Sequence, residues 1–407
     1  MKECRTVEWK ESVSNSFLKT VSAFANYGSG SIVFGLADTR AACLDIENKI
    51  NDSIDPTPFF SLTENTRKKT VTLAIEEGPN KPYLYKGKAY RRSDTATVEV
   101  DNVELRRLVL AGQNMHFEEL PCHEQDLTFH ALEEKLEAEH VVKALNGDVL
   151  RTFNLFNFET GFNNAALIVS DQNTFPGIDV ARFGKNINTI ADRSTFEGTS
   201  VIEQIDGACT MFERYYSAET IEGARRTTHY SIPYEAFREA VANAVAHRTW
   251  DVNAKIRIAM HPDRIEISSP GGLPAGLGRD EYLRGFISQL RNPILANVLF
   301  RLNIIEMFGT GIVRIRSSYA EYEQKPEFDV SENAVRVTLP VTDARPALTS
   351  DEELVYRFVK EEGSAASGQI VANFGFGKDK AVKLLRSLVE KRYVEKTGTG
   401  RGTKYHA

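Results

Sequence analysis

The sequence has few cysteines and no long apolar run. Its four cysteines, Cys4, Cys43, Cys122 and Cys209, stand singly among 407 residues, without the paired spacing of a zinc site or a disulfide framework. No stretch approaches the roughly 18 apolar residues of a membrane span. The N-terminal stretch MKECRTVEWKES also lacks the apolar segment of a signal peptide. These absences predict a reduced, cytoplasmic protein.

A general excess of positive charge is also missing. The formal net charge is -6, and the 42% of hydrophobic residues predicts two to four domains with proper cores rather than a disordered chain. An average over several domains can hide a basic one. Residues 376–407 contain nine Lys or Arg and three acidic residues, a net charge of +6, which leaves -12 for the remainder. This distribution indicates nucleic-acid contact near the end of the chain.

The basic segment belongs to a pattern of three helices and a hairpin after a polar linker at 342–350. The first helix is expected to start at Thr349 or Ser350 and to stop at Gly363. A short helix over 368–374 and a third that buries Val382, Leu385, Leu388 and Val389 follow. With the glycine-rich turn at 398–402, this order resembles a winged helix-turn-helix domain. The DNA contacts expected from it are Lys378, Lys380, Lys383, Arg386, Arg401 and Lys404. A winged helix used for protein contacts would show the same basic face.

The first 112 residues predict a compact α+β unit. A helix from Phe17 to Ala25 is expected to stop at Gly28 in a left-handed conformation, strands are expected at 31–38 and 70–77, and Asp101 caps a second helix. The stretches ECRTVEWKE (3–11), SAFAN (22–26), IVFGLAD (32–38) and YRRSDT (90–95) together resemble the Schlafen AlbA_2 domain. The resemblance implies nucleic-acid binding.

In RNA-cleaving relatives of this domain, three carboxylates bind a divalent metal, and the matching residues here are Glu3, Glu8 and Asp38. In the alternative, Glu8 pairs with Lys10 or Arg91 and the other two carboxylates are solvated. A basic run that includes Arg91 and Arg92 is interleaved with Tyr83, Tyr85 and Tyr90, a composition expected where a surface follows a nucleic-acid backbone. Alternating residues on an exposed strand pair would look the same.

The middle of the chain predicts a helix over 233–247 that places Glu239, Asn243 and His247 on one polar stripe, and strands over 255–260 and 264–268. With the stretches 263–274, 291–293 and 305–312, this helix resembles the GHKL ATPase superfamily in its divergent, HATPase_c_4-like form. The resemblance implies that Asn243 coordinates Mg²⁺ on ATP, that Glu239 orients water, and that Gly309, Thr310 and Gly311 cover the phosphates. Ser269 stands where the superfamily has its adenine-binding aspartate. Alternatively, the fold is kept only as a scaffold.

The expected architecture is an α+β multidomain chain with an AlbA_2-like domain at 1–112, a GHKL-like α/β sandwich at 113–345 and a winged helix at 346–407. The function expected from it is a regulator of transcription that binds DNA and responds to ATP or another nucleotide, with a homodimer suited to paired half-sites. The alternatives are a metal-dependent endonuclease acting on RNA or single-stranded DNA, and a weak ATPase. Residues 113–225 contain no chemical motif.

Overall fold

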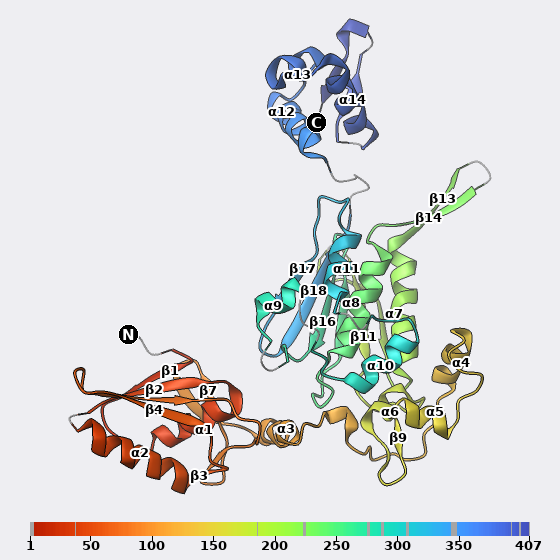
Figure 1. Ribbon diagram of the computed structural model, residues 1–407. Coiled ribbons are helices and arrows are strands. Elements are labelled where there is room, and N and C mark those ends of the chain that lie inside the picture. Colours follow the sequence, from red (N-terminus) through yellow and green to blue (C-terminus); the bar gives the residue numbers. More distant parts are fainter. Residues whose placement is uncertain are drawn as a thin grey trace. The chain divides into compact units, whose positions relative to one another are not determined.

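The computed structural model describes residues 4–36, 38–184, 186–222, 225–274, 277–285, 289–306, 309–342, 348–391, 393–398 and 400–406. The chain divides into two compact units, Met1–Leu120 and Pro121–Ala407. Helices and several separate sheets occur along the chain, which confirms the α+β multidomain fold (Figure 1). Within the part of the chain that the structure describes, no helix has both the length and the apolar character needed to cross a membrane.

The first unit contains a four-stranded sheet with the order β1-β2-β5-β4. Strand β1 (Val7–Lys10) runs parallel to β2 (Gly30–Gly35), and β5 (Thr70–Ile75) and β4 (Phe60–Asn65) continue the sheet antiparallel. Its helices are α1 (Phe17–Tyr27), α2 (Thr39–Ser53) and α3 (Asn102–Gly112). Two small ribbons pair β3 (Ile54–Asp55) with β6 (Leu84–Tyr85) and β7 (Tyr90–Ser93) with β8 (Ala96–Glu99).

The predicted helices of this unit are confirmed. In α1, Phe17 packs its ring edge-on against Phe34 of β2 at 5.4 Å between centroids, and the Asp101 side chain accepts hydrogen bonds from the first backbone amides of α3. Gly28 has a positive φ of 141° but an extended ψ of 139°, so the residue that follows α1 is not left-handed helical as expected. Helix α2 was not predicted. Asp38 caps it, and its buried positions Ala42, Ile46 and Ile50 recur every four residues.

The second unit is built on a six-stranded sheet with the order β12-β11-β15-β16-β18-β17. Strands β11 and β15 are parallel and the other neighbours are antiparallel. The strands are β11 (Ile178–Phe183), β12 (Ile190–Phe196), β15 (Ile256–Met260), β16 (Arg264–Pro270), β17 (Glu327–Val330) and β18 (Ala334–Pro340). The predicted strands at 255–260 and 264–268 are thus confirmed.

Helices α7 (Val201–Tyr216) and α8 (Tyr234–Ala246) pack against this sheet and each other, with the Phe212 and Phe237 rings stacked at 4.3 Å. Along β16, Ile265, Ile267 and Ser269 are buried while the alternate residues are partly exposed, so one face of the sheet forms the core. The remaining elements are α4 (His130–Ala138), α5 (Gly147–Thr152), β9 (Phe156–Asn157), β10 (Gly161–Phe162), α6 (Asn164–Val169), β13 (Ser217–Glu222), β14 (Arg225–Tyr230), α9 (Arg279–Arg284), α10 (Pro293–Arg301) and α11 (Gly311–Ser318). The packing of α7 and α8 against the six-stranded sheet agrees with the α/β sandwich that the sequence predicts for this region.

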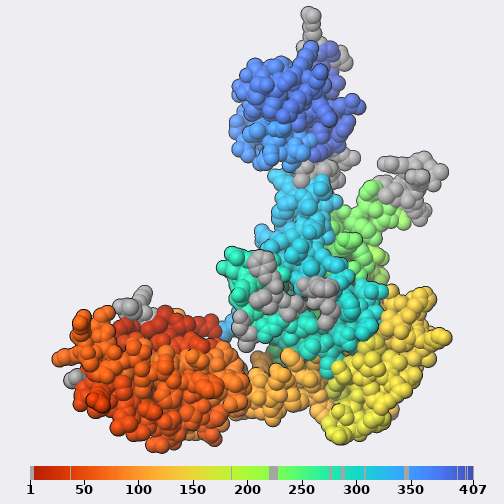
Figure 2. All heavy atoms as spheres, in the orientation of Figure 1, coloured from red at the N-terminus to blue at the C-terminus, as the bar shows by residue number. Residues whose placement is uncertain are grey.

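The C-terminal residues fold around a core cluster of their own that includes Val355, Ile370, Leu385 and Tyr405. The elements are α12 (Ser350–Glu362), α13 (Ser367–Phe374), α14 (Lys378–Glu390), β19 (Glu395–Thr397) and β20 (Lys404–His406), in the order expected from the sequence. They form a rounded body, blue in Figure 2. Val382 is 41% exposed, so its assignment to the buried face of α14 was wrong.

A buried carboxylate joins α12 to α14. Glu352 is 4% exposed and accepts hydrogen bonds from the Lys391 ammonium at 2.8 Å and the Ser387 hydroxyl at 2.6 Å. Burial raises its pKa, but these bonds and those from Thr349 outweigh that effect and lower the pKa to about 2. The ionised carboxylate therefore holds the end of α14 against the start of α12 at neutral pH.

Candidate functional site

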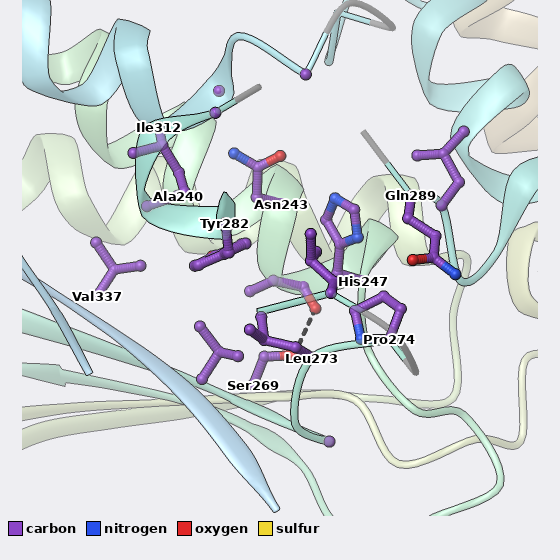
Figure 3. A pocket seen from close by; sticks show the side chains of 18 of the residues that line it. Ala240, Asn243, His247, Ser269, Leu273, Pro274, Tyr282, Gln289, Ile312 and Val337 are labelled. Atoms are coloured by element: carbon purple, nitrogen blue, oxygen red, sulfur yellow. Dashed lines mark hydrogen bonds between the residues drawn. The ribbon is translucent and has the colours of Figure 1, made fainter. Parts of the chain in front are cut away.

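A pocket lies between α8, strands β16 and β18, the segments on either side of α9, and the segment that leads into α11. The empty space between these elements, including the part that is open to solvent, is roughly 980 Å³. Figure 3 shows Asn243 and His247 from α8 and Ser269 from the end of β16 around this space. The wall is mostly apolar, formed by Ala240, Ala244, Ile267, Leu273, Pro274, Leu277, Leu290, Ile305, Ile312, Val335 and Val337.

Helix α8 supplies the polar stripe that its sequence predicts. Asn243 lines the pocket and donates its amide Nδ2 to Glu239 Oε1 at 3.1 Å. Glu239 is only 4% exposed and is not among the described residues that line the pocket. Burial raises its pKa, and the hydrogen bond from Asn243 opposes this shift. The carboxyl group therefore lies behind Asn243 and orients its amide.

The three residues Gly309, Thr310 and Gly311 lie beside this pair, at the start of α11. Gly309 has a φ of 68°, in the region that favours glycine. The Thr310 hydroxyl is buried and has no hydrogen-bond partner among the described residues. Nearby, Glu306 lines the pocket and pairs with Arg314 of α11, with Oε1 and Nη2 3.1 Å apart. The structure thus brings the expected residues of α8 and α11 together.

Gly311 fits only because it has no side chain. A Cβ at this position would lie 2.5 Å from Asn243 Nδ2 and 2.7 Å from Glu239 Oε1, closer than real Cβ contacts. We expect Gly311→Ala to displace the Asn243 amide and to weaken ligand binding at the pocket by about ten-fold, at a stability cost of roughly 1–3 kcal/mol. Calorimetric titration with adenosine, beside thermal unfolding, measures both effects. Gly147→Ala, in α5, is the control for a glycine substitution outside the pocket, because a Cβ there meets open space. Equal affinities of Gly311→Ala and the parent protein would contradict the close-contact argument.

Ser269 is placed to accept a hydrogen bond rather than to donate one. It is 7% exposed, and its hydroxyl donates to the backbone oxygen of Ala244 at 2.7 Å (Figure 3). Because the proton is used there, the remaining lone pairs of Oγ are what the hydroxyl offers to a ligand. An exocyclic amino group is a donor of the matching kind. A contact between Ser269 and an adenine base stays a prediction.

His247 forms another part of the pocket wall. Burial, and to a smaller extent the charge of Arg291, lower its pKa to about 4. Its imidazole is therefore neutral at pH 7 and has one donor and one acceptor nitrogen. Arg291 also donates Nη2 to the backbone oxygen of Gly272 at 2.8 Å, which fixes the loop after β16.

Asn292 is a structural residue whose role the sequence did not reveal. Its side chain is buried and donates to the backbone oxygens of Ala246 and Arg248, both at 2.8 Å. These carbonyls end α8 and have no helical partner of their own. Asn292 therefore caps the C-terminal end of α8, the helix that carries Asn243 and is followed by His247. The feature of the sequence that marks Asn292 is its position before Pro293, the first residue of α10.

The N-terminal carboxylates have other partners in this structure. Glu8 is 8% exposed and pairs with Lys10 at 2.8 Å and with Arg92 at 3.5 Å, and Asp38 accepts from the Ala41 amide as the cap of α2. Glu3 lies outside the described residues. Among the residues that are described, no three His, Cys, Asp or Glu side chains form a group suited to a metal. A metal site at Glu3, Glu8 and Asp38 stays a prediction.

In the basic run of the first unit, Arg92 is buried and Arg91 is partly buried, whereas Lys86 and Lys88 are exposed. Arg92 is 7% exposed and donates to Thr97 at 3.0 Å, and Arg91 pairs with Glu104 at 3.3 Å. Tyr83, Tyr85 and Tyr90 are buried in the core, so the prediction that they interleave with the basic residues on a binding surface was wrong. The strand alternation suggested exposure, but Asn26 holds the backbone of Tyr83 through bonds of 2.8 and 2.9 Å and turns this segment inward.

Most of the described basic residues of the C-terminal segment are exposed, and several have acidic partners. Lys380 pairs with Asp351 at 2.7 Å and Arg386 with Glu390 at 3.1 Å. Lys378 and Lys383 of α14 are exposed and make no ion pair with any residue that the structure describes. Lys404 is exposed on β20, whereas the side chain of Arg401 lies outside the described residues.

Two protein-family models match parts of this chain. A family model described as "Schlafen, AlbA_2" matches residues 3–101. A second one, "Putative ATP-dependent DNA helicase recG C-terminal", matches residues 253–339, which include Ser269 and Gly309–Gly311 but not α8. The two matches support an AlbA_2 domain and a recG-like C-terminal domain and suggest a nucleic-acid-related, ATP-associated function.

Comparison with solved structures concerns the fold alone. The crystal structure of the DIP2311 protein from Corynebacterium diphtheriae resembles this chain with a TM-score of 0.50 and 17% sequence identity. The similarity covers 99% of this chain and 92% of that one. No curated protein matches the sequence. This chain therefore has a fold similar to that of the Corynebacterium protein, together with the two matched domains.

Proposed function

We propose that this protein is a DNA-binding regulator of transcription whose activity responds to an adenine-containing ligand. The observation that carries the proposal is the face of α14 that includes Lys378 and Lys383, two exposed ammonium groups without an acidic partner among the described residues. A regulator needs a contact with DNA and a site for a signal. The basic face of α14 would make the contact with DNA, and the pocket would bind the signal.

The order of elements supports DNA contact by α14. Three helices followed by the β19–β20 ribbon is the order of a winged helix, in which the third helix enters the major groove. The intramolecular pairs of Lys380, Arg386 and Lys391 reduce the charge that these residues offer to phosphate. Lys378 and Lys383 keep theirs, at the start and in the first half of the helix. These two side chains are thus the best placed to contact phosphates or base edges.

The AlbA_2 match supports a second nucleic-acid contact in the first unit. In that unit Arg92 pairs with Glu8, so we expect residues other than Arg92 to make the nucleic-acid contact. A homodimer remains part of the proposal, because paired half-sites suit a two-fold protein. Enzymatic turnover is not part of it.

Removing residues 346–407 tests the assignment of DNA contact. Each phosphate that a protein neutralises contributes about -0.9 to the slope of log affinity against log salt concentration. We expect the shortened chain to bind duplex DNA more weakly and with a flatter salt dependence than the full chain. Fluorescence anisotropy of a labelled duplex over a salt series measures both, and thermal unfolding verifies that the rest of the chain is folded. An unchanged slope would remove the C-terminal residues from the DNA contact.

A further inference from the structure

We infer that the pocket takes the base and sugar of an adenine nucleoside and disfavours a triphosphate with its Mg²⁺. This inference rests on the proposed role of the pocket as a ligand site, and it specifies the ligand class. It departs from what the resemblance to ATPases implies. The grounds are the unequal chemistry of the two ends of the pocket.

The end near β16 suits a flat, weakly polar base. Ile267, Leu273 and Val337 line it, and Ser269 offers an acceptor for an amino group. His247 adds an uncharged donor and acceptor. Burying an aromatic base against such side chains is favourable without any charge on the ligand. Adenine has the amino donor that Ser269 would accept.

At the other end, the arginine that could meet phosphate, Arg314, is already paired with Glu306 at 3.1 Å. None of the described residues that line the pocket is a lysine or an arginine. A triphosphate would bring three to four negative charges, which a protein normally meets with Lys, Arg or free backbone amides.

The start of α11 is already close to carboxylates. Glu239 Oε1 lies 2.7 Å from the position of a Cβ on Gly311, the first residue of that helix. Glu306 pairs with Arg314 one turn further on. Because a helix N-terminus attracts anions through its partial positive charge, the Glu239 carboxyl compensates part of the charge that would otherwise attract phosphate, and Glu306 occupies the Arg314 guanidinium.

The pair that would hold Mg²⁺ fits poorly. Mg²⁺ in such sites is bound by one or two carboxylates together with phosphate oxygens and water. Here Glu239 is buried behind Asn243, and Asn243 donates its amide N–H to it, which leaves one amide oxygen facing the pocket. A triphosphate would therefore enter without the cation ligands it needs.

Calorimetric titration of the full chain with adenosine and with ATP, each with Mg²⁺ and with a chelator, tests the inference. We expect adenosine to bind equally well in both conditions and ATP with Mg²⁺ to bind at least about ten-fold more weakly, from the repulsion of nearby like charges. Tighter binding of ATP with Mg²⁺ than of adenosine would overturn the inference and leave the pocket as a ligand site. Failure of both compounds to bind the folded protein would overturn the ligand site as well.

Glu306→Gln extends the test to one side chain. Glu306 lines the pocket with 39% of its side chain exposed, so the variant is compatible with folding. Removing its charge should raise the ratio of ATP affinity to adenosine affinity by roughly five-fold. The control Glu137→Gln makes the same charge change at an exposed residue of α4 that does not line the pocket. An equal ratio in the two variants would contradict the role given to the carboxylates.

Discussion

Replacing Lys378 and Lys383 together with alanine will weaken binding of duplex DNA by roughly 10- to 100-fold at low salt. Both ammonium groups are exposed on α14 and unpaired among the described residues, so their charge is available to phosphate. Two lost phosphate contacts will also reduce the salt slope by about 1.8. Anisotropy of a labelled duplex between about 50 and 200 mM salt measures both changes.

The matched control replaces Arg357 and Lys360 of α12 with alanine. This pair removes the same charge from an exposed helix, but Arg357 pairs with Glu353 at 3.1 Å and Lys360 lies over the Tyr356 ring at 5.8 Å. We expect it to change affinity by only a small factor. Equal losses in the two double variants would indicate attraction by net charge alone, and no loss in the α14 variant would contradict DNA contact through this helix.

A second large effect is expected from His247 when the protein is acidified. Its pKa of about 4 in the folded chain lies below the ordinary value of 6.5 because the imidazole is buried. Between these two values the unfolded chain binds a proton that the folded chain does not, so stability falls as pH decreases. The loss from this residue reaches about 2 kcal/mol at pH 5 and about 3 kcal/mol at pH 4.

Urea unfolding at pH 7 and pH 5 measures this effect. The chain has two tryptophans, Trp9 in the first unit and Trp250 in the second, so a Trp9→Phe background restricts the fluorescence signal to the unit that contains His247. In this background we expect His247→Gln to lose about 2 kcal/mol less than the parent between the two pH values. His123→Gln, an exposed histidine of the same unit, should follow the parent. Parallel pH dependence in all three proteins would mean that His247 is not buried as a neutral group.

The sequence predicted best those features that depend on neighbouring residues. The spacing of Glu239 and Asn243 fixed both on one face of α8, and Asp101 capped α3 as expected, because helix period and capping are local properties. Helix α2 was missed although Asp38 and the repeat from Ala42 to Ile50 marked it. Asp38, a predicted metal ligand, caps α2.

Features that depend on distant partners were not predictable in this way. Arg92 pairs with Glu8 of another strand, and nothing in the basic run around Arg92 shows that such a partner exists. The same limit applies to Asn292, whose two acceptors lie more than 40 positions earlier in the chain. In both cases tertiary packing decides whether a polar side chain faces a ligand or the interior.

The position of Asn292 also bears on the chemical durability of the protein. Loss of ammonia from its amide would leave a carboxylate against the two carbonyl oxygens that end α8, with repulsion in place of two hydrogen bonds. Asparagines usually deamidate through attack by the backbone nitrogen of the next residue. Here that residue is Pro293, whose nitrogen carries no hydrogen. Pro293, the first residue of α10, thus protects the Asn292 side-chain amide at the end of α8 from deamidation.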